Sequence, residues 1–265
     1  MTEEQKYLFD LQGYLIVPGI LTAEQVVLYN SELDRLLAMP ADQFPGNSTK
    51  EEKSKAVSTE GSDILIRNIA ECGESFEQLI DHPASLEYLR EMIGHSEIRM
   101  AASSSIIRAQ GDLTRLHRGR TPILGQFQYR FENGKFYCNL IVMMYCLTDL
   151  EQGSGGLSVI PGSHKSNFPC AYFIKGHPEK SPCPDDVPTL VELQAKAGDA
   201  IFFTEDLTHG SKTNLSDKQR RNLYYRYQPS FCTPNISGTK PVSQELMERL
   251  MPERKELLDR FNGFG

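Results

Sequence analysis

The strongest constraint on the fold is a change in hydrophobic period near Ile98. From there on, short segments rich in β-branched and aromatic residues recur, and Gly and Pro residues separate them. The strand-like segments are 98–107, 136–147, 156–160, 200–203 and 223–227. Many short strands with turn signals between them favour a double-sheet jelly roll. We therefore predict a mainly β chain with flanking helices, in the α+β class, built on a jelly-roll core.

Helical patterns flank this strand-rich region. Thr22 and Gln25 form a capping-box pattern at the start of a helix that runs to about Met39. A second helix is expected over 83–93, and a closing helix over 243–261, bent or split at its internal proline. These helices should pack on one side of the β core.

The remaining segments read as connections or short strands. Residues 9–18 look like a strand entered through Gly13, and 40–61 looks like a polar surface loop or lid. Asn133-Gly134, between two apolar runs, predicts a hairpin. No repeat or boundary divides the chain, so we expect one domain over 1–265. Its expected parts are N-terminal helices over about 20–95, a jelly-roll core over about 96–230 and a C-terminal helix over about 243–262.

Composition excludes several classes of protein. The formal net charge of −7 argues against nucleic acid or an anionic membrane as the main partner. No apolar run approaches the ~18 residues that span a bilayer, and the charged N-terminus does not resemble a signal peptide. The six cysteines are scattered without a CxxC pair, which is typical of reduced thiols. We expect a cytoplasmic protein whose partner is a small molecule; the sequence leaves the oligomeric state open.

Two histidines far apart in the chain are the candidate metal ligands. His117 lies in a loop that leads into strand structure, and His209 follows an apolar strand that would deliver it to a sheet edge. Two imidazoles and a carboxylate, with coordination positions left open, are typical of non-haem iron(II) oxygenases. The open positions would take 2-oxoglutarate and O2.

Arg220 is the candidate anchor for the distal carboxylate of 2-oxoglutarate, because a guanidinium binds a carboxylate through two parallel hydrogen bonds. Arg221 is its rival, and on a strand the two side chains would point to opposite faces. Ser211 is a further candidate for the same carboxylate. Asn139 and Gln126 are candidates for contact with 2-oxoglutarate or substrate, and Arg118, Arg120 and Arg226 for an anionic group of the substrate.

The chain resembles the phytanoyl-CoA dioxygenase (PhyH-like) family of iron(II)/2-oxoglutarate oxygenases. The resemblance rests on FDLQGYLIVPG at 9–19, GGLSVIPGSHK at 155–165, AGDAIFF at 197–203 and the segment 209–220, and it covers nearly the whole chain. It implies a double-stranded β-helix (cupin-like) core, iron held by an HxD…H triad and an Arg that binds 2-oxoglutarate. His117, His209 and Arg220 match those positions, whereas Gly119 stands where the family carries a carboxylate.

Three interpretations of Gly119 remain open. A halide could fill the vacated position, as in related halogenases with Gly or Ala there, which would add chloride to the cofactors. Glu205, four residues before His209, could supply the carboxylate instead. Two histidines, 2-oxoglutarate and water could also suffice. The sequence most favours an iron(II)/2-oxoglutarate-dependent dioxygenase that hydroxylates a C–H bond of a small molecule; the alternatives are a halogenase and a non-catalytic ligand-binding relative.

Overall fold

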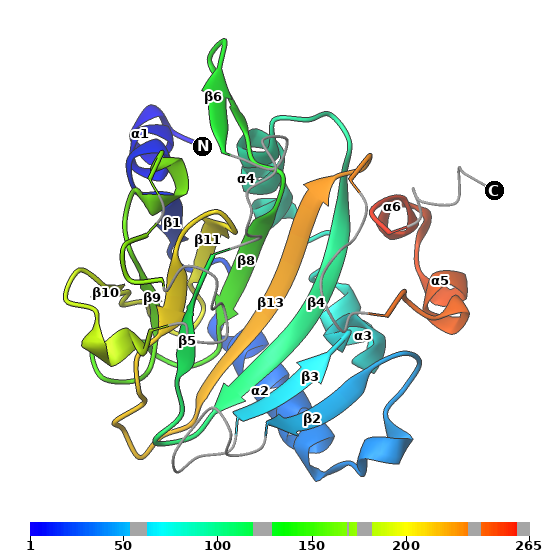
Figure 1. Cartoon of the computed structure of the whole chain (residues 1–265). Helices are drawn as coiled ribbons and strands as arrows, with labels where there is room; N and C mark the ends of the chain where they lie inside the picture. The colour runs from blue at the N-terminus through cyan, green and yellow to red at the C-terminus, as the bar shows by residue number, and fades with distance from the viewer. Residues whose placement is uncertain (54–62, 119–128, 169, 174–181, 233–239, 259–265) are drawn as a thin grey trace.

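Two antiparallel sheets form the framework of the chain (Figure 1). The computed structural model describes residues 1–53, 63–118, 129–168, 170–173, 182–232 and 240–258. The seven-stranded major sheet has the order β1 (Tyr14–Val17), β11 (Ala200–Thr204), β8 (Ile141–Cys146), β13 (Arg220–Pro229), β4 (Ile98–Arg108), β3 (Asp63–Arg67) and β2 (Thr49–Lys53). The four-stranded minor sheet has the order β10 (Val191–Glu192), β9 (Leu157–Val159), β12 (His209–Ser211) and β5 (Thr114–His117).

The core lies in two layers, one on each face of the major sheet. Between the sheets, alternate residues of β8 and β11, including Met144 and Phe203, pack against Val159 of the minor sheet. The opposite face of the major sheet carries the larger core and is covered by α2 (Ala23–Ala38), α3 (Glu74–Glu77) and α4 (Pro83–Ile93) (Figure 1). This arrangement is the predicted jelly roll with helices on one side.

Buried tyrosines of β13 attach the helical layer to the sheet. The hydroxyl of Tyr225 donates to the carbonyl of Phe76 at 2.7 Å, and the hydroxyl of Tyr227 donates to the carbonyl of Ile80 at 2.7 Å. Both rings are fully buried. Since their side chains point to the helices, the alternate residues of β13 point into the space between the sheets.

The expected helices are confirmed, and the first two have their expected ends. Thr22 and Gln25 form the capping box of α2, and Gly94, in a left-handed conformation with φ 72°, ends α4. The closing helix is split into α5 (Gln244–Arg249) and α6 (Pro252–Glu256), as its proline predicted. Residues 259–261 of that prediction lie outside the described part of the chain. The hairpin at Asn133-Gly134 joins β6 (Arg130–Glu132) to β7 (Lys135–Tyr137).

The N-terminal prediction was wrong in two places. Residues 9–12 belong to a helix, α1 (Glu3–Gln12), which a second capping box of Thr2 and Gln5 begins and Gly13 ends at φ 83°. Only β1 remains of the expected strand. The polar segment 40–61, read as a loop, contains a 3₁₀ turn at Ala41–Gln43 and then β2, which pairs with β3. The region over about 20–95, expected to contain helices and a surface loop, therefore also supplies β2 and β3.

Three short 3₁₀ helices complete the described elements: η2 (Ile69–Cys72), η4 (Ser163–Lys165) and η6 (Pro184–Asp186). All six cysteines are free thiols. Within the described residues, no helix has both the length and the apolar character needed to cross a membrane.

Candidate metal centre

The two candidate histidines face each other across the minor sheet. β5 ends at His117, β12 begins at His209, and the antiparallel register sets the two residues directly opposite. Their ring centroids are 4.1 Å apart. Pairing of two short strands thus brings together side chains that the sequence separates widely.

Glu205 is the third member of this group. It lies in the turn between β11 and β12, where its backbone N–H donates to the carbonyl of Leu140 at 3.0 Å. One ligand atom from each of His117, Glu205 and His209 lies within 4.8 Å of the others. The Oε2 atom of Glu205 is buried and has no hydrogen-bond partner among the residues that the structure describes. Two imidazole nitrogens and one unpartnered carboxylate oxygen form a donor set that suits iron(II).

Both imidazoles are oriented by backbone carbonyls. The Nδ1 atom of His117 lies 3.0 Å from the carbonyl oxygen of Arg115, and that of His209 lies 2.7 Å from the carbonyl oxygen of Leu207. A proton on each Nδ1 satisfies these contacts and leaves Nε2 as the ligand atom.

The electrostatics favour a neutral His209 and an ionised Glu205. Burial, and then the neighbouring His117, lower the pKa of His209 to about 4. Burial opposes ionisation of Glu205, but attraction to His209, Arg226 and His117 offsets it and holds the pKa of Glu205 below its ordinary value. These are the protonation states that metal ligation requires.

Arg220 and Arg221 have different surroundings. The Arg220 side chain is buried, its exposed fraction is 3%, and its Nε atom has no partner in the described part of the chain. Arg221 lies on the opposite face of β13 and forms an ion pair of 2.7 Å with Asp34. An unpaired buried guanidinium costs free energy unless an anion meets it. Arg220 is therefore the arginine of this pair with an anion-binding environment.

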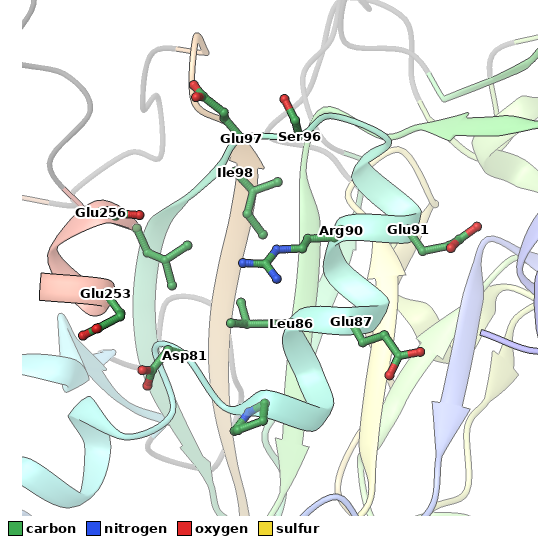
Figure 2. A pocket seen from close by; sticks show the side chains of 12 residues that line it. Asp81, Leu86, Glu87, Arg90, Glu91, Ser96, Glu97, Ile98, Glu253 and Glu256 are labelled. Carbon is green, nitrogen blue, oxygen red and sulfur yellow. The ribbon is translucent and has the colours of Figure 1, made fainter. Parts of the chain in front are cut away.

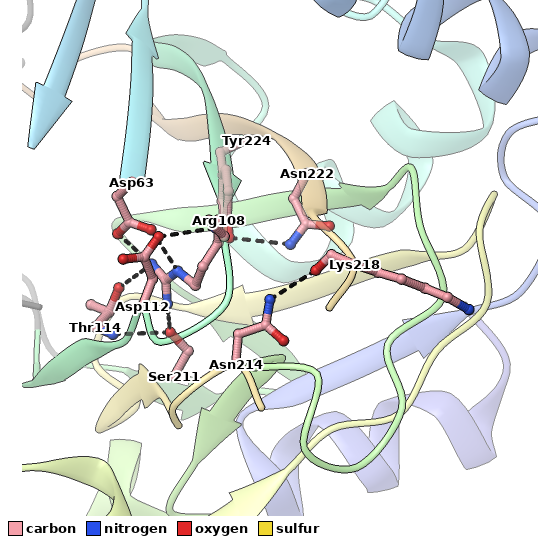
Figure 3. Close-up of polar contacts among 10 residues, drawn as sticks. Asp63, Arg108, Asp112, Thr114, Ser211, Asn214, Lys218, Asn222 and Tyr224 are labelled. Atoms are coloured by element: carbon pink, nitrogen blue, oxygen red, sulfur yellow. Dashed lines mark hydrogen bonds and ion pairs between the residues drawn. The ribbon is translucent and has the colours of Figure 1, made fainter. Parts of the chain in front are cut away.

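A second buried arginine, Arg108, lies opposite Arg220 in the register of β4 and β13. Its guanidinium binds both carboxylate oxygens of Asp63, at 3.0 and 3.1 Å, and donates to Thr114 Oγ1 at 2.5 Å (Figure 3). It also donates to the hydroxyl of Ser211. Asp63 thus balances the charge of Arg108.

Ser211 is held by Arg108, a contact that was not predicted. Its Oγ atom accepts from Arg108 and from the backbone N–H of Thr114, so its own O–H remains available to donate. Arg108 and Asp63 were not predicted from the sequence. The signal for Arg108 was a basic residue directly after Ile106 and Ile107 at the end of a strand.

The other predicted site residues are distributed around the same interior or lie outside the described chain. Asn139 is buried with an unpartnered Nδ2 atom. Half-buried Arg226 donates to Ser104 Oγ at 3.2 Å, and its guanidinium lies 5.6 Å from the ring centroid of Tyr224. Arg118 points elsewhere and donates to the carbonyl of His164 at 3.2 Å. Gly119, Arg120 and Gln126 lie outside the described residues.

A pocket on the helical side of the major sheet does not suit a dicarboxylate such as 2-oxoglutarate. It has a volume of about 810 Å³ and lies between α4, the start of β4 and α6 (Figure 2). Its lining carries the carboxylates of Asp81, Glu87, Glu91, Glu97, Glu253 and Glu256. Arg90 is the one basic residue among the described residues of the lining, and the excess of carboxylates would disfavour an anionic co-substrate there.

The fold and the donor set define a jelly-roll protein of the non-haem iron oxygenase class. Residues 9–222 match the family described as phytanoyl-CoA dioxygenase (PhyH). The chain belongs to this family of iron(II)/2-oxoglutarate-dependent dioxygenases and is an enzyme of that class.

Similar proteins agree with this placement. An ectoine dioxygenase of Stutzerimonas stutzeri (strain A1501) is 26% identical over 258 residues, covering 84% of this chain and 78% of that protein. The dioxygenase af480 of Aspergillus fumigatus is 23% identical and covers 97% of this chain and 76% of its own length. HygX from Streptomyces hygroscopicus, solved with nickel, 2-oxoglutarate and hygromycin B, aligns with a TM-score of 0.75 at 22% identity, over 92% of this chain and 97% of that one. The structural likeness confirms the jelly-roll fold.

Proposed function

We propose that this enzyme hydroxylates a C–H bond of a small molecule in an iron(II)- and 2-oxoglutarate-dependent reaction. One observation carries the proposal: His117, Glu205 and His209 converge within 4.8 Å, while the major sheet contributes a buried Arg220 whose Nε atom has no partner among the described residues. The three converging side chains suit a divalent cation, and the buried guanidinium suits one carboxylate of a dicarboxylate.

His117, Glu205 and His209 would hold the iron. When bound, iron(II) supplies the activation of O2 that 2-oxoglutarate decarboxylation drives. The chain's own contribution is to present two Nε2 lone pairs, fixed by the carbonyls of Arg115 and Leu207, and one carboxylate. The unpartnered Oε2 of Glu205 supports its assignment as the third ligand.

Arg220 would bind the distal carboxylate of 2-oxoglutarate. The Asp63–Arg108 pair supports this role, because Arg108 is already neutralised and Arg220 is not. Ser211, oriented by Arg108, can donate its free O–H to the same carboxylate. Asn139 has an unpartnered amide nitrogen to offer to 2-oxoglutarate or to the substrate. Arg226, which affects the pKa of Glu205, is placed to attract an anionic substrate group.

Glu205 favours hydroxylation over halogenation. A halide would be needed as the anionic iron ligand only if no carboxylate replaced the one missing at Gly119. The carboxylate of Glu205 already lies beside both imidazoles. We expect the product formed in chloride buffer to gain the mass of oxygen. A product mass that contains chlorine would overturn this choice.

A small polar metabolite is the substrate class we infer. The similar ectoine dioxygenase is named for a small molecule, and the HygX structure contains hygromycin B. The half-buried Arg226 near the metal centre favours a substrate with an anionic group.

The test is 2-oxoglutarate binding and turnover in two matched variants. Arg220→Gln should weaken 2-oxoglutarate binding by about tenfold to a hundredfold, because a charge-assisted bidentate contact is lost. Arg221→Gln removes an equal charge from the opposite face of β13, which the helices cover, and should leave 2-oxoglutarate binding unchanged. Binding can be followed through the visible absorption band that iron(II) and 2-oxoglutarate give together without oxygen, and turnover through succinate once air is admitted.

Two results would contradict the proposal. Equal effects of the Arg220 and Arg221 substitutions would remove Arg220 as the anchor. Absence of both the absorption band and succinate from the wild-type enzyme would favour a ligand-binding protein without catalytic activity.

A further inference from the structure

A second pocket lies on the outer face of the minor sheet. It has a volume of about 360 Å³, and Arg118, Ile160, Ser163, Phe168, Tyr172 and Thr208 are among the residues that line it. Leu116 and Ile160 pack outward against Val187 and Leu190, in a small cluster of their own. Their chain neighbours His117 and Val159 face the interior. The pocket and the metal centre therefore lie on opposite faces of the sheet.

The Thr208 hydroxyl is buried at this pocket. The exposed fraction of the residue is 1%, and its Oγ1 atom has no hydrogen-bond partner among the described residues. Its backbone N–H donates to Ser163 Oγ at 2.8 Å, which fixes the residue against the pocket wall. Buried hydroxyls normally find a partner, so this one points to a missing acceptor or donor.

Arg118 independently indicates a missing ligand at this pocket. Its Nε atom is buried without a partner, and its one hydrogen bond among the described residues goes to the carbonyl of His164. Asp206 attracts the guanidinium but makes no ion pair with it within 4.0 Å among the described residues. The half-buried guanidinium thus has no bonded carboxylate among the described residues, and an oxyanion would supply the missing anionic partner.

Two aromatic residues, Phe168 and Tyr172, also line the pocket. Tyr172 packs in the outer cluster, and Phe168 lies at the pocket with an exposed fraction of 80%. Aromatic rings offer a flat apolar surface to a planar ligand.

We propose that this pocket binds a small molecule that carries an oxyanion, a carboxylate or a phosphate, on a planar apolar body. Arg118 and Thr208 bind the oxyanion, and Tyr172 and Phe168 contact the body. The site is distinct from the slot at Arg220. Because Arg118 follows His117 and Thr208 precedes His209, its occupant would touch the two backbone segments that hold the imidazoles.

The test is calorimetric titration of the full chain with phenyl phosphate and with benzoate, using phenol as the neutral control. We expect both anions, or one of them, to bind and phenol not to. The better binder identifies the oxyanion as phosphate or carboxylate. Thr208→Val, which keeps the shape but removes the hydroxyl, and Arg118→Gln should each weaken binding by about tenfold.

Two control variants separate this pocket from the co-substrate slot. Thr208→Ser keeps the hydroxyl and Arg220→Gln alters only the slot, so both should bind the anion as the wild type does. If Arg118→Gln does not fold, Thr208→Val alone carries the test. Unchanged binding in Thr208→Val, loss of binding in Arg220→Gln, or no binding of either anion to the wild type would overturn the proposal. None of these outcomes depends on catalysis.

Discussion

Neighbouring carboxylates at the metal centre have different environments. Asp206 accepts the backbone N–H of Tyr129 at 2.7 Å, and burial raises its pKa to about 6. The pKa of Glu205 is instead lowered, and one of its oxygens has no partner. Asp206 therefore stabilises the turn through its contact with the Tyr129 N–H, whereas Glu205 presents an ionised carboxylate to the histidines.

Glu205 was predicted as a candidate ligand from its spacing to His209, but the conformation of the segment between them differs from the expected one. Its spacing from His209 suggested two residues on one face of an extended strand. Residues 205–208 form a turn instead, and β12 begins at His209. Proximity in the chain selected Glu205 as a candidate, and its role as a ligand stays a prediction. Its convergence with His117 depends on the pairing of β5 with β12, which spacing alone does not define.

The buried pair of Asp63 and Arg108 gives a stability prediction. Asp63→Asn leaves the Arg108 guanidinium buried without an anion, which should lower the free energy of unfolding by about 3 kcal/mol. Asp34→Asn removes the exposed partner of Arg221 and should cost less than about 1 kcal/mol. Urea denaturation of both variants measures the difference, and equal losses would show that Arg108 does not depend on Asp63.

His164 gives a prediction about pH. Burial, and then repulsion by Lys165, lower its pKa from 6.5 to about 4. The unfolded chain therefore takes up a proton before the folded one, so stability should fall as pH drops from 6.5 to 4. At ~1.4 kcal/mol per pKa unit, the His164 contribution is about 3 kcal/mol.

The control for the His164 prediction is its own replacement. His164→Gln can still donate to the carbonyl of Asp10, which His164 contacts at 3.1 Å, but it does not titrate. Its unfolding free energy should fall less steeply between pH 6.5 and 4 than that of the wild type. Parallel curves for the two proteins would contradict the assignment.

At the scale of elements, Gly13 joins helix α1 to strand β1. It adopts φ 83°, and a Cβ atom there would lie 2.5 Å from Nδ1 of His164. The sequence analysis used Gly13 as the entry to a strand but missed the helix before it, because the Thr2–Gln5 capping box stands at the very start of the chain. The polar strand β2 was missed because it is an edge strand with no apolar alternation.

Gly13 and Gly19 form a matched pair for testing this junction. Both have positive φ, 83° and 63°, but a Cβ at Gly19 would meet nothing within 4 Å. Gly19→Ala should cost about 1 kcal/mol for the backbone conformation alone. Gly13→Ala should cost about 2 kcal/mol more, because the His164 ring must move. Thermal unfolding distinguishes them, and equal melting temperatures would show that the ring is not closely packed on Gly13.

At the scale of the whole molecule, the site depends on the closure of the two sheets. The major sheet supplies Arg220 and, from the end of β11, Glu205; the minor sheet supplies both histidines. The period of the strands predicted the jelly roll, and the residue types predicted the metal and the co-substrate. The sequence could not predict which strands pair, and it therefore missed the Asp63–Arg108 pair that lies beside Arg220.

The central claim is that Glu205 takes the place of the carboxylate that the motif at His117 lacks. The most direct measurement is the anaerobic iron(II) affinity of Glu205→Gln beside that of Asp206→Asn. Loss of a charged ligand should weaken binding by at least about tenfold in Glu205→Gln, while Asp206→Asn, which can still accept the Tyr129 N–H, should bind iron as the wild type does. Wild-type affinity in Glu205→Gln would contradict the account.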